Sequence, residues 1–489
     1  MITPEILAKY EPVIGLEVHA QMLTKSKAFC TCTTAFGAPP NTNVCPICLG
    51  HPGTLPMLNE NLVKFIVKMG LATNCQIRER SIFARKNYFY PDLPKGFQIS
   101  QYETPICHDG WVECELPDGS YKKIGITRIH MEEDSGKSIH DFGVDTLVDL
   151  NRAGVPLIEI VSEPDMRTSE EGYAYLTTIK SIVTYLGICD GNMEEGSLRC
   201  DANVSVRLKG TEKFGQKTEV KNLNSFRNVQ RAIEAEIIRQ IEVIESGGAV
   251  IHQTMQFDAN KGTTRPMRTK EEAADYRYFP EPDLLPVTIT QKYLDDIRAE
   301  QPELQRARRD RFVKDFGIPK YDADVITVDG ATADYFEHAV SALPKKSNDL
   351  IKSLSNYVMG DVMRMMSEKK KAIHELGLKP EHLSELLTLV GDSIISNKIA
   401  KDLLPELLDS EKSPKQIVEE RGMVQVSDTG AIIEEVKKIL SANPDNIEKY
   451  KAGKTSLLGF FVGQTMKAMG GKANPTMLNE IVKQELEKV

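Results

Sequence analysis

The sequence lacks any long apolar segment. Its longest apolar run near the C-terminus, Leu457-Leu-Gly-Phe-Phe-Val-Gly463, is far shorter than the roughly 20 residues that a membrane span needs. The N-terminal segment Met1–His19 has neither a basic start nor an extended apolar core, so we expect no secretory signal peptide. These absences predict a protein without a membrane anchor, and we expect it in the cytoplasm.

The sequence also lacks an excess of positive charge. Lys and Arg number 61 against 70 Asp and Glu, which gives a formal net charge of −9. A basic field over the whole surface is therefore excluded, and any nucleic-acid partner must meet a local basic patch. The cysteines number nine, and four of them cluster at metal-like spacing. A reducing compartment therefore fits better than a disulfide framework.

Several common catalytic motifs are missing as well. Gly136-Lys-Ser138 and Gly453-Lys-Thr455 resemble the end of a P-loop, but Met131 and Glu448 stand where its first glycine is required. The sequence contains no G-x-G-x-x-G fingerprint, no G-x-S-x-G elbow and no Gly/Ser-rich stretch like that of an amidase. If this protein uses ammonia, another chain must release it.

The hydrophobic pattern predicts an α+β fold with a largely antiparallel sheet, followed by helices. The first three-fifths contain segments with a period of two and no regular βα alternation. We expect strands at 13–21, 124–131, 157–161 and 198–207, and helices at Glu170–Leu186 and Arg227–Ser246, the second capped by Asn224 or Ser225. Further helices are expected at Gln305–Phe316, Ala331–Ala342, Leu350–Met366 and Pro380–Ser396, with three or four short ones at the end.

A length of 489 residues suggests about three domains. The turn-rich segment Phe279–Pro286 marks the end of the sheet region. We expect a catalytic domain at 1–292, a helical domain at 293–405 and a small helical tail at 406–489.

The clearest isolated motif is Cys30-x-Cys32-x12-Cys45-x2-Cys48. A Pro- and Gly-containing turn presents the second pair of thiols, as in a zinc knuckle. Four thiolates close the coordination sphere of Zn²⁺, so the expected site is structural rather than catalytic. The alternative is four buried or incidental cysteines, which the paired spacing disfavours.

A second motif is a polar strand face that recurs along the chain. In a strand, Glu17 and His19 share one side with Gln21, while the residues between them are apolar. The alternative for this segment alone is the solvent side of an edge strand. The same alternation recurs in further segments, which contain Arg128, His130 and Glu132; Arg199, Asp201 and Asn203; and Glu219 and Lys221. Glu159 is a lone carboxylate inside an apolar run, which is costly unless it binds a cation or a donor.

Clustered carboxylates with a histidine suit Mg²⁺ and polyphosphate, and neighbouring arginines suit the phosphates. Two further segments resemble walls of such a site. The aromatic, proline-stiffened loop Arg85–Phe97 carries Lys86 and Lys95. The segment Thr264–Phe279 carries the cofactor-binding candidates Arg265, Arg268 and Arg277. Taken alone, each segment could be an ordinary charged loop.

Together these residues resemble the GatB family, the B subunits of bacterial and organellar aspartyl/glutamyl-tRNA amidotransferases. The resemblance covers nearly the whole chain. It is carried by Val13-Ile-Gly-Leu-Glu-Val-His19, Cys45-Pro-Ile-Cys-Leu-Gly50, Lys86-Asn-Tyr-Phe-Tyr-Pro-Asp-Leu-Pro-Lys-Gly96, His130-Met-Glu-Glu-Asp-Ser-Gly136, Met193-Glu-Glu-Gly-Ser-Leu-Arg-Cys-Asp-Ala-Asn-Val-Ser205, Glu219-Val-Lys-Asn-Leu-Asn-Ser225, Asp275-Tyr-Arg-Tyr-Phe-Pro280, Gly459-Phe-Phe-Val-Gly-Gln-Thr-Met-Lys467 and Gly471-Lys-Ala-Asn-Pro475.

The resemblance implies a fold, a reaction and partners. The fold is a glutamine-synthetase-like cradle, a helical domain and a YqeY-like tail. Mg-ATP phosphorylates the side-chain carboxylate of Glu or Asp misacylated on tRNA(Gln) or tRNA(Asn). Ammonia from the glutaminase of an A subunit then displaces phosphate, in a heterotrimer with a small C subunit. Such an acyl phosphate needs cations to neutralise the charge of ATP during transfer.

The resemblance also implies residue roles. The implied metal ligands are Glu17, His19, Glu132 and Glu159 for Mg²⁺, and Cys30, Cys32, Cys45 and Cys48 for Zn²⁺, although some members of the family lack the cysteines. The implied catalytic residues are Glu132, Glu133, Lys86 and Lys95, with both lysines near the gate of the ammonia route. The expected nucleotide-binding set is Arg199, Asp201, Asn203, Glu219, Lys221, Arg265, Arg268 and Arg277.

Two other classes of protein stay open as alternatives. One is a free-standing ATP-dependent carboxylate–amine ligase that acts on a small molecule. Such an enzyme has no need for the lysine-containing tail at 449–472. The other is a non-catalytic, zinc-containing scaffold that binds RNA or a partner protein. A scaffold has no reason to gather Glu17, His19, Glu132 and Glu159.

Overall fold

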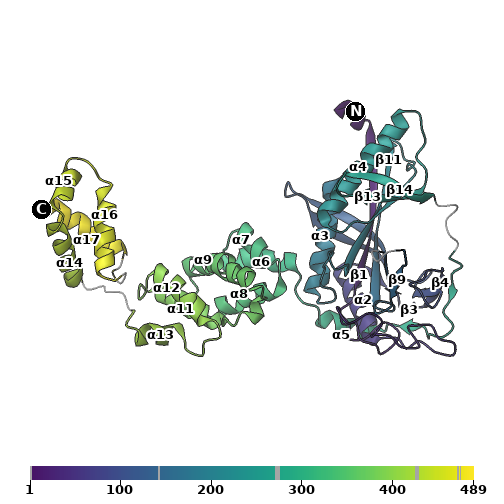
Figure 1. Ribbon diagram of the computed structural model, residues 1–489, viewed down its shortest axis with the longest axis horizontal. Coiled ribbons are helices and arrows are strands. Elements are labelled where there is room, and N and C mark those ends of the chain that lie inside the picture. Colours follow the sequence, from purple (N-terminus) through teal and green to yellow (C-terminus); the bar gives the residue numbers. More distant parts are fainter. Residues whose placement is uncertain are drawn as a thin grey trace. The chain divides into compact units, whose positions relative to one another are not determined.

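The computed structural model describes residues 3–140, 144–269, 276–423, 429–470, 473 and 475–488. Contacts within the chain divide it into two compact units, Met1–Leu304 and Gln305–Val489, and each is described here by itself. Figure 1 shows the elements of both units, coloured from the N-terminus to the C-terminus. Among the described residues, no helix combines the length and apolar character needed to cross a membrane.

The first unit is built on one nine-stranded sheet. The strand order is β14-β13-β12-β11-β1-β10-β7-β6-β2, and only the pair β12–β13 is parallel. The strands are β1 (Tyr10–Gln21), β2 (Gln76–Ile77), β6 (Cys107–Glu115), β7 (Tyr121–Glu133), β10 (Pro156–Ser162), β11 (Leu198–Leu208), β12 (Thr218–Lys221), β13 (Gln253–Asp258) and β14 (Thr263–Thr269). This confirms the prediction of a mixed fold with a largely antiparallel sheet.

One face of the sheet is apolar and carries the helices. Leu16, Val18 and Ala20 of β1 are buried, whereas the residues between them are only partly buried. These apolar residues form one core with the helices α2 (Glu60–Ala72), α3 (Ser169–Tyr185) and α4 (Phe226–Glu245). In Figure 1, α3 and α4 run along the strands. These helices do not cover the opposite, polar face of the central strands.

The two predicted helices of this unit are present, with small differences at their ends. Ser225, rather than Asn224, caps α4, because its side chain accepts a hydrogen bond from Asn228 N. Gly247 follows α4 with a φ of +82°, a left-handed conformation that glycine adopts at little cost. A further helix, α5 (Gln291–Ala299), packs against α2 and adds Ile297 to the same core.

Two segments expected to form walls of the site, the first of them as a loop, contain strands. The segment from Arg85 to Phe97 begins in β4 (Ala84–Asn87) and ends in β5 (Phe97–Ser100), which pair with each other and with β15 (Phe279–Pro280). The segment from Thr264 begins in β14, the outermost strand of the large sheet. Residues 270–275 lie outside the described part. Polar residues alternate with apolar ones only briefly here, so pairing with distant strands decides the conformation.

The second unit is helical. Its first core unites α6 (Gln305–Phe316), α7 (Lys320–Ile326), α8 (Gly330–Ala342), α9 (Asn348–Tyr357), a π-helical turn (Val358–Val362), α10 (Met363–Lys369), α11 (Pro380–Gly391), α12 (Asn397–Leu403) and α13 (Pro414–Glu420). The expected helix Pro380–Ser396 is too long. The chain leaves α11 after Gly391, Ser393 has a φ of +58°, and Ser396 caps α12 instead.

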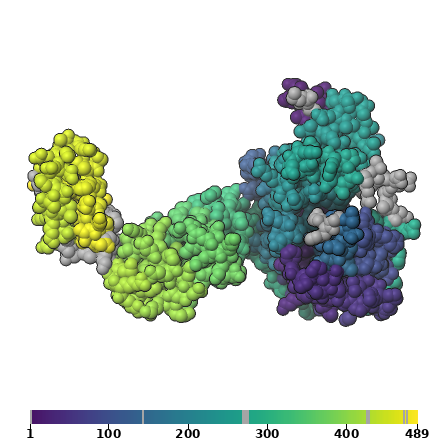
Figure 2. All heavy atoms as spheres, in the orientation of Figure 1, coloured from purple at the N-terminus to yellow at the C-terminus, as the bar shows by residue number. Residues whose placement is uncertain are grey.

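A separate core holds four C-terminal helices. Together with α13, the described part of the chain after residue 406 contains five α-helices, more than the three or four expected there. The four helices of the separate core are α14 (Thr429–Ser441), α15 (Pro444–Lys451), α16 (Leu457–Ala468) and α17 (Pro475–Lys488). Leu478 and Val482 of α17 are fully buried against Ile432 and Phe461 in this core. In the space-filling view, the four helices form a closely packed body (yellow, Figure 2). Gly471 and Lys472 lie outside the described residues.

Candidate active site and metal centres

Polar side chains lie in rows across the polar face of the large sheet. On β1, His19 is opposite Glu159 of β10 on one side and Arg199 of β11 on the other. Glu159 is in turn opposite His130 of β7. Directly opposite residues on neighbouring strands project to the same face. The strand order therefore gathers four groups that are far apart in the sequence.

The next rows continue this polar face towards β12. Glu17 of β1 is opposite Asp201 of β11, and Asn203 of β11 is opposite Glu219 of β12. Asn203 Nδ2 also donates a hydrogen bond of 3.0 Å to Glu17 Oε1. The structure thus brings together most of the residues predicted from the alternating strands.

The first carboxylate group consists of His19, Glu132 and Glu159. One ligand atom from each lies within 4.8 Å of the others. His19 Nε2 is 3.3 Å from Glu159 Oε2, and His130 Nε2 is 3.3 Å from Glu132 Oε1. Arg128 approaches the other oxygen of Glu159 at 3.7 Å. Two buried carboxylates and an imidazole at this spacing can hold a divalent cation.

Both carboxylates in this group are held in the charged form. Burial by itself would raise the pKa of Glu132, but the nearby Lys86 ammonium and His130 keep that pKa below its usual range. Burial acts in the same direction on Glu159, and the two histidines, His130 and His19, lower its pKa. Lys86 Nζ is 3.6 Å from Glu132 Oε1 and lies over the ring of Tyr276. A divalent cation binds carboxylates in this ionised form.

Glu133, the residue after Glu132, makes a separate ion pair. Its side chain forms an ion pair with Lys95 and accepts a hydrogen bond of 2.9 Å from Ile99 N. Lys95 also lies over the ring of Phe97, at 5.3 Å from the centroid. The two predicted catalytic lysines therefore contact adjacent carboxylates, Lys86 with Glu132 and Lys95 with Glu133.

The second carboxylate group consists of Glu17, Asp201 and Glu219, whose oxygens also lie within 4.8 Å of one another. Lys221 Nζ joins two of them, at 2.6 Å from Asp201 and 3.1 Å from Glu219. Burial and the neighbouring charges of Glu159 and Glu219 raise the pKa of Glu17. Repulsion of this kind is relieved when a cation binds between the carboxylates.

The predicted arginines lie at different distances from the two carboxylate groups. Arg199 lies in the row of His19 and donates a hydrogen bond of 2.8 Å to Asp134. Arg265 is on the same face but farther away, on the edge strand β14, where it is opposite Gln256 of β13 and donates to it. Arg268 stands opposite Thr254 in the backbone register, but its side chain lies outside the described part. Arg277 is exposed beside Asn87, which donates a hydrogen bond of 2.8 Å to its carbonyl oxygen.

Two residues at the site were not predicted from the sequence. Ser100 Oγ donates to Glu132 Oε1 at 2.8 Å, and Gln98 Nε2 donates to Glu132 Oε2 at 3.1 Å. Both lie on β5, where they alternate with the apolar Phe97 and Ile99. That period of two was a usable signal, but four residues are too few to separate a strand from a loop.

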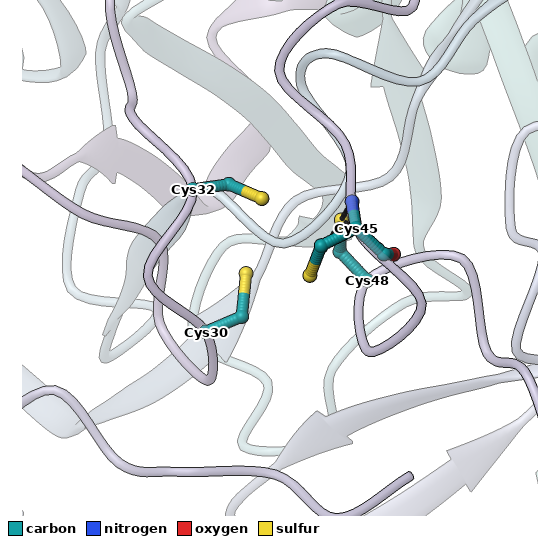
Figure 3. A group of neighbouring side chains, drawn as sticks. All are labelled: Cys30, Cys32, Cys45 and Cys48. Atoms are coloured by element: carbon teal, nitrogen blue, oxygen red, sulfur yellow. Dashed lines mark hydrogen bonds between the residues drawn. The ribbon is translucent and has the colours of Figure 1, made fainter.

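The four clustered cysteines also come together. Their sulfur atoms all lie within 4.8 Å of one another, and those of Cys45 and Cys48 are 3.9 Å apart. Figure 3 shows the sulfurs of Cys30 and Cys32 turned towards those of Cys45 and Cys48. Sulfurs placed about 2.3 Å from zinc in a tetrahedron are about 3.8 Å apart, so this donor set fits the ion.

Local hydrogen bonds prepare one cysteine as a thiolate. A hydrogen bond from the Cys30 thiol, the backbone N–H of Cys45 and the nearby Lys27 ammonium lower the pKa of Cys48 to about 4. The pKa of Cys30 rises in return, because its thiol proton is held between the two sulfurs and because it is buried. We call Cys30, Cys32, Cys45 and Cys48 the cysteine cluster.

Comparison with known proteins gives matches over almost the entire chain. A family model described as the GatB/GatE catalytic domain matches residues 12–295, and one described as the GatB domain matches residues 334–486. A protein of Chlorobium limicola is 55% identical over 98% of this chain and 100% of its own length. One of Chlorobaculum tepidum is 56% identical over 98% and 99%. Both are named as the B subunit of an aspartyl/glutamyl-tRNA(Asn/Gln) amidotransferase.

Proposed function

This chain belongs to the GatB family, and from that membership we infer that it is the B subunit of an aspartyl/glutamyl-tRNA(Asn/Gln) amidotransferase. Such a protein is an ATP-dependent carbon–nitrogen ligase that acts in protein biosynthesis. A free-standing small-molecule ligase and a zinc-containing scaffold are both disfavoured, because the identity extends through the helical and C-terminal parts.

The reaction has two steps. A side-chain carboxylate oxygen of Glu or Asp on misacylated tRNA attacks the γ-phosphorus of ATP, and ADP leaves. Ammonia then attacks the carbonyl carbon of the acyl phosphate, and inorganic phosphate leaves, which gives the amide. The first step concentrates negative charge, so it requires positive groups positioned in advance.

The two carboxylate groups are the proposed cation sites for the first step. His19, Glu132 and Glu159 would hold one Mg²⁺, and the second carboxylate group, to which Glu17 belongs, could hold another. Bound Mg²⁺ would neutralise phosphate oxygens during transfer. Arg199 and Lys221 border the same face and provide cationic hydrogen-bond donors for phosphate oxygens. The helices α2, α3 and α4 pack on the other face of the sheet, so they do not compete with substrate for these polar groups.

Lys86 and Lys95 are the proposed contacts for the second step. Each is paired with a carboxylate, Lys86 with Glu132 and Lys95 with Glu133. Attack by ammonia releases a proton, and a carboxylate such as Glu133 can accept it. The pairing holds both carboxylates in place before the substrate arrives.

The cysteine cluster is proposed to bind one structural Zn²⁺. All four ligands are sulfur, which leaves no open position for a reacting water. The ion would fix the loop that follows β1 to the turn at 45–48.

The finer features of the family reading are proposed as well. We assign the sheet unit to a glutamine-synthetase-like cradle and the C-terminal helices to a YqeY-like tRNA-binding tail. The partners are a glutaminase A subunit and a small C subunit in a heterotrimer, together with misacylated Glu-tRNA(Gln) or Asp-tRNA(Asn). We also propose a cytoplasmic location for the complex.

The observation that carries the proposal is the charged, buried Glu132 between Lys86 and His130. Glu132→Gln keeps the shape and one of the two acceptor oxygens but removes the charge. In the assembled complex we expect it to reduce ATP-dependent amidation of misacylated tRNA by at least about 100-fold. Basal glutamine hydrolysis on the partner chain should remain measurable. The assay follows radiolabelled acyl phosphate and amidated product beside glutaminase turnover.

Glu212→Gln is the matched control, since Glu212 is exposed on the loop after β11. It removes the same charge from the same unit and should leave both activities at the wild-type level. Formation of acyl phosphate at the wild-type rate by Glu132→Gln would show that the phosphoryl-transfer centre lies elsewhere.

A further inference from the structure

Lys27 is a fully buried lysine that lies beside the cysteine cluster. Its Nζ is 3.6 Å from Cys48 Sγ, 2.7 Å from Asn43 O and 3.4 Å from Leu150 O. Among the described residues, no carboxylate forms an ion pair with it. A buried ammonium is strongly destabilising unless it is paired with an anion, and two carbonyl oxygens supply only part of that compensation. The remaining partner within hydrogen-bonding distance is the sulfur.

A zinc-bound cysteine cluster carries negative charge, opposite in sign to the Lys27 ammonium. Four thiolates around Zn²⁺ leave a net charge of −2, and this charge is half-buried here because Cys30 and Cys48 are buried. N–H groups that approach metal-bound ligands normally stabilise them, and losing such a contact lowers metal affinity. Lys27 is therefore placed where its charge and that of the cluster compensate each other.

We propose that Lys27 is a positioning residue for the zinc site: its ammonium partly neutralises the cysteine cluster and ties it to the chain at Leu150. This inference rests on the proposed zinc binding. It adds a residue to the site that the spacing of the cysteines does not indicate.

The contact at Leu150 connects the cysteine cluster with the polar face of the sheet. Ala28 N, next to Lys27, donates to Gly154 O at 2.8 Å, and Gly154 N donates to Asp134 O at 2.9 Å. Gly154 has a φ of +85°, which favours glycine at this close approach. Asp134 accepts hydrogen bonds from Gln21 and Arg199 on the polar face. Loss of the Lys27 contact should therefore loosen the end of β7 as well as the zinc site.

Lys27→Met tests the charge, because methionine fills a similar volume without an ammonium. In the purified full-length chain, the rate of zinc transfer to a colorimetric chelator should rise by about 10-fold or more. Lys25→Met is the matched control, since Lys25 is exposed two residues away, and it should release zinc at the wild-type rate. Circular dichroism checks that the variants are folded.

Lys27→Gln separates charge from hydrogen bonding, because its amide still donates to Asn43 O or Leu150 O. It should also release zinc faster than the wild type. After substitution with Co²⁺, the sulfur-to-cobalt charge-transfer band of both variants should shift to lower energy, because the sulfur electrons lose a stabilising positive charge. Release within twofold of the wild type, together with an unchanged band, would overturn the assignment of Lys27.

The zinc proposal itself has a separate readout. If the wild type binds no zinc, the zinc site fails and the role of Lys27 fails with it. If the wild type binds zinc and Cys45→Ser loses it, the zinc site stands, and the Lys27 variants alone decide the second question.

Discussion

At the scale of single residues, burial of charge determines what this site can do. Glu132 and Glu159 are among the few buried carboxylates of the sheet unit, and each is held by histidines or Lys86. A buried carboxylate with several cationic neighbours keeps its charge at neutral pH without a metal. The ionic contacts therefore prepare the site before any cation or substrate binds.

The cysteine cluster provides a prediction at this scale. Cys45→Ser should remove one of four ligands, and zinc content should fall from about one ion per chain to near zero. Metal analysis of the purified protein measures this directly. Cys189→Ser is the matched control, because Cys189 is buried away from the cluster in the core of the sheet unit. Stoichiometric zinc in Cys45→Ser would contradict the assignment.

At the scale of elements, a buried carboxylate adds polar contacts to the apolar packing of α4 on the sheet. Glu236 on α4 accepts hydrogen bonds from Thr218 of β12 at 2.7 Å and from Thr264 of β14 at 2.7 Å. Gln240 and Arg239 of the same helix also donate hydrogen bonds to the Glu236 carboxylate. Burial alone would raise the pKa of Glu236, but Arg239 and these hydrogen bonds lower it below its usual range.

This lowered pKa predicts a pH-dependent stability. The contribution of Glu236 is present above its unfolded pKa of about 4.5 and is lost as pH falls through the lower folded value. Glu236→Gln should lower the unfolding free energy by about 1–3 kcal/mol at pH 7, and the difference should shrink below about pH 4.5. Denaturant unfolding followed by Trp111, the single tryptophan and part of β6, reports on this sheet.

Glu242→Gln is the control for that experiment. Glu242 is exposed on the same helix, so the same substitution should change the unfolding free energy by less than about 0.5 kcal/mol. A pH-independent difference between Glu236→Gln and the wild type would show that the carboxylate charge does not contribute.

At the scale of the whole molecule, the sheet unit and the C-terminal helices have separate cores. The C-terminal helices pack around Ile432, Phe461 and Leu478. Ile417 and Val418 of α13 belong to the other helical core, so a cut at residue 406 would damage that core. A deletion that starts at residue 429 removes the C-terminal core alone.

Deletion of residues 429–489 should separate tRNA binding from ATP binding. This segment contains more lysines than carboxylates, in contrast to the acidic chain as a whole. Lysines that contact phosphates release counterions, so tRNA affinity should fall and its salt dependence should become weaker, while ATP affinity stays unchanged. Filter binding over a range of salt concentrations measures both effects.

Lys449→Gln, Lys451→Gln and Lys454→Gln combined offer a test without deletion, since all three lysines are exposed. The triple variant should reduce the slope of log affinity against log salt concentration by up to about 3. Unchanged affinity and slope in both the deletion and the triple variant would exclude these helices as the tRNA contact.

The sequence by itself determined the longest elements of the sheet unit and the spacing of the cysteines. The period of two in β1, β7 and β11 and the helical periods of α3 and α4 are visible because apolar residues lie on one side of each element. The motifs also identified the family, since their residues are contiguous or closely spaced. The roles assigned to the individual site residues stay predictions that the experiments above address.

Only the tertiary structure decided which of these residues meet. The order β11-β1-β10-β7 places Glu159 between His19 and His130, and it leaves Arg265 on an edge strand. It also buries Lys27 against Cys48. Strand pairing uses backbone hydrogen bonds that every residue can make, so strand order leaves little trace in local sequence. A lysine such as Lys27 resembles any surface lysine until distant segments close over it.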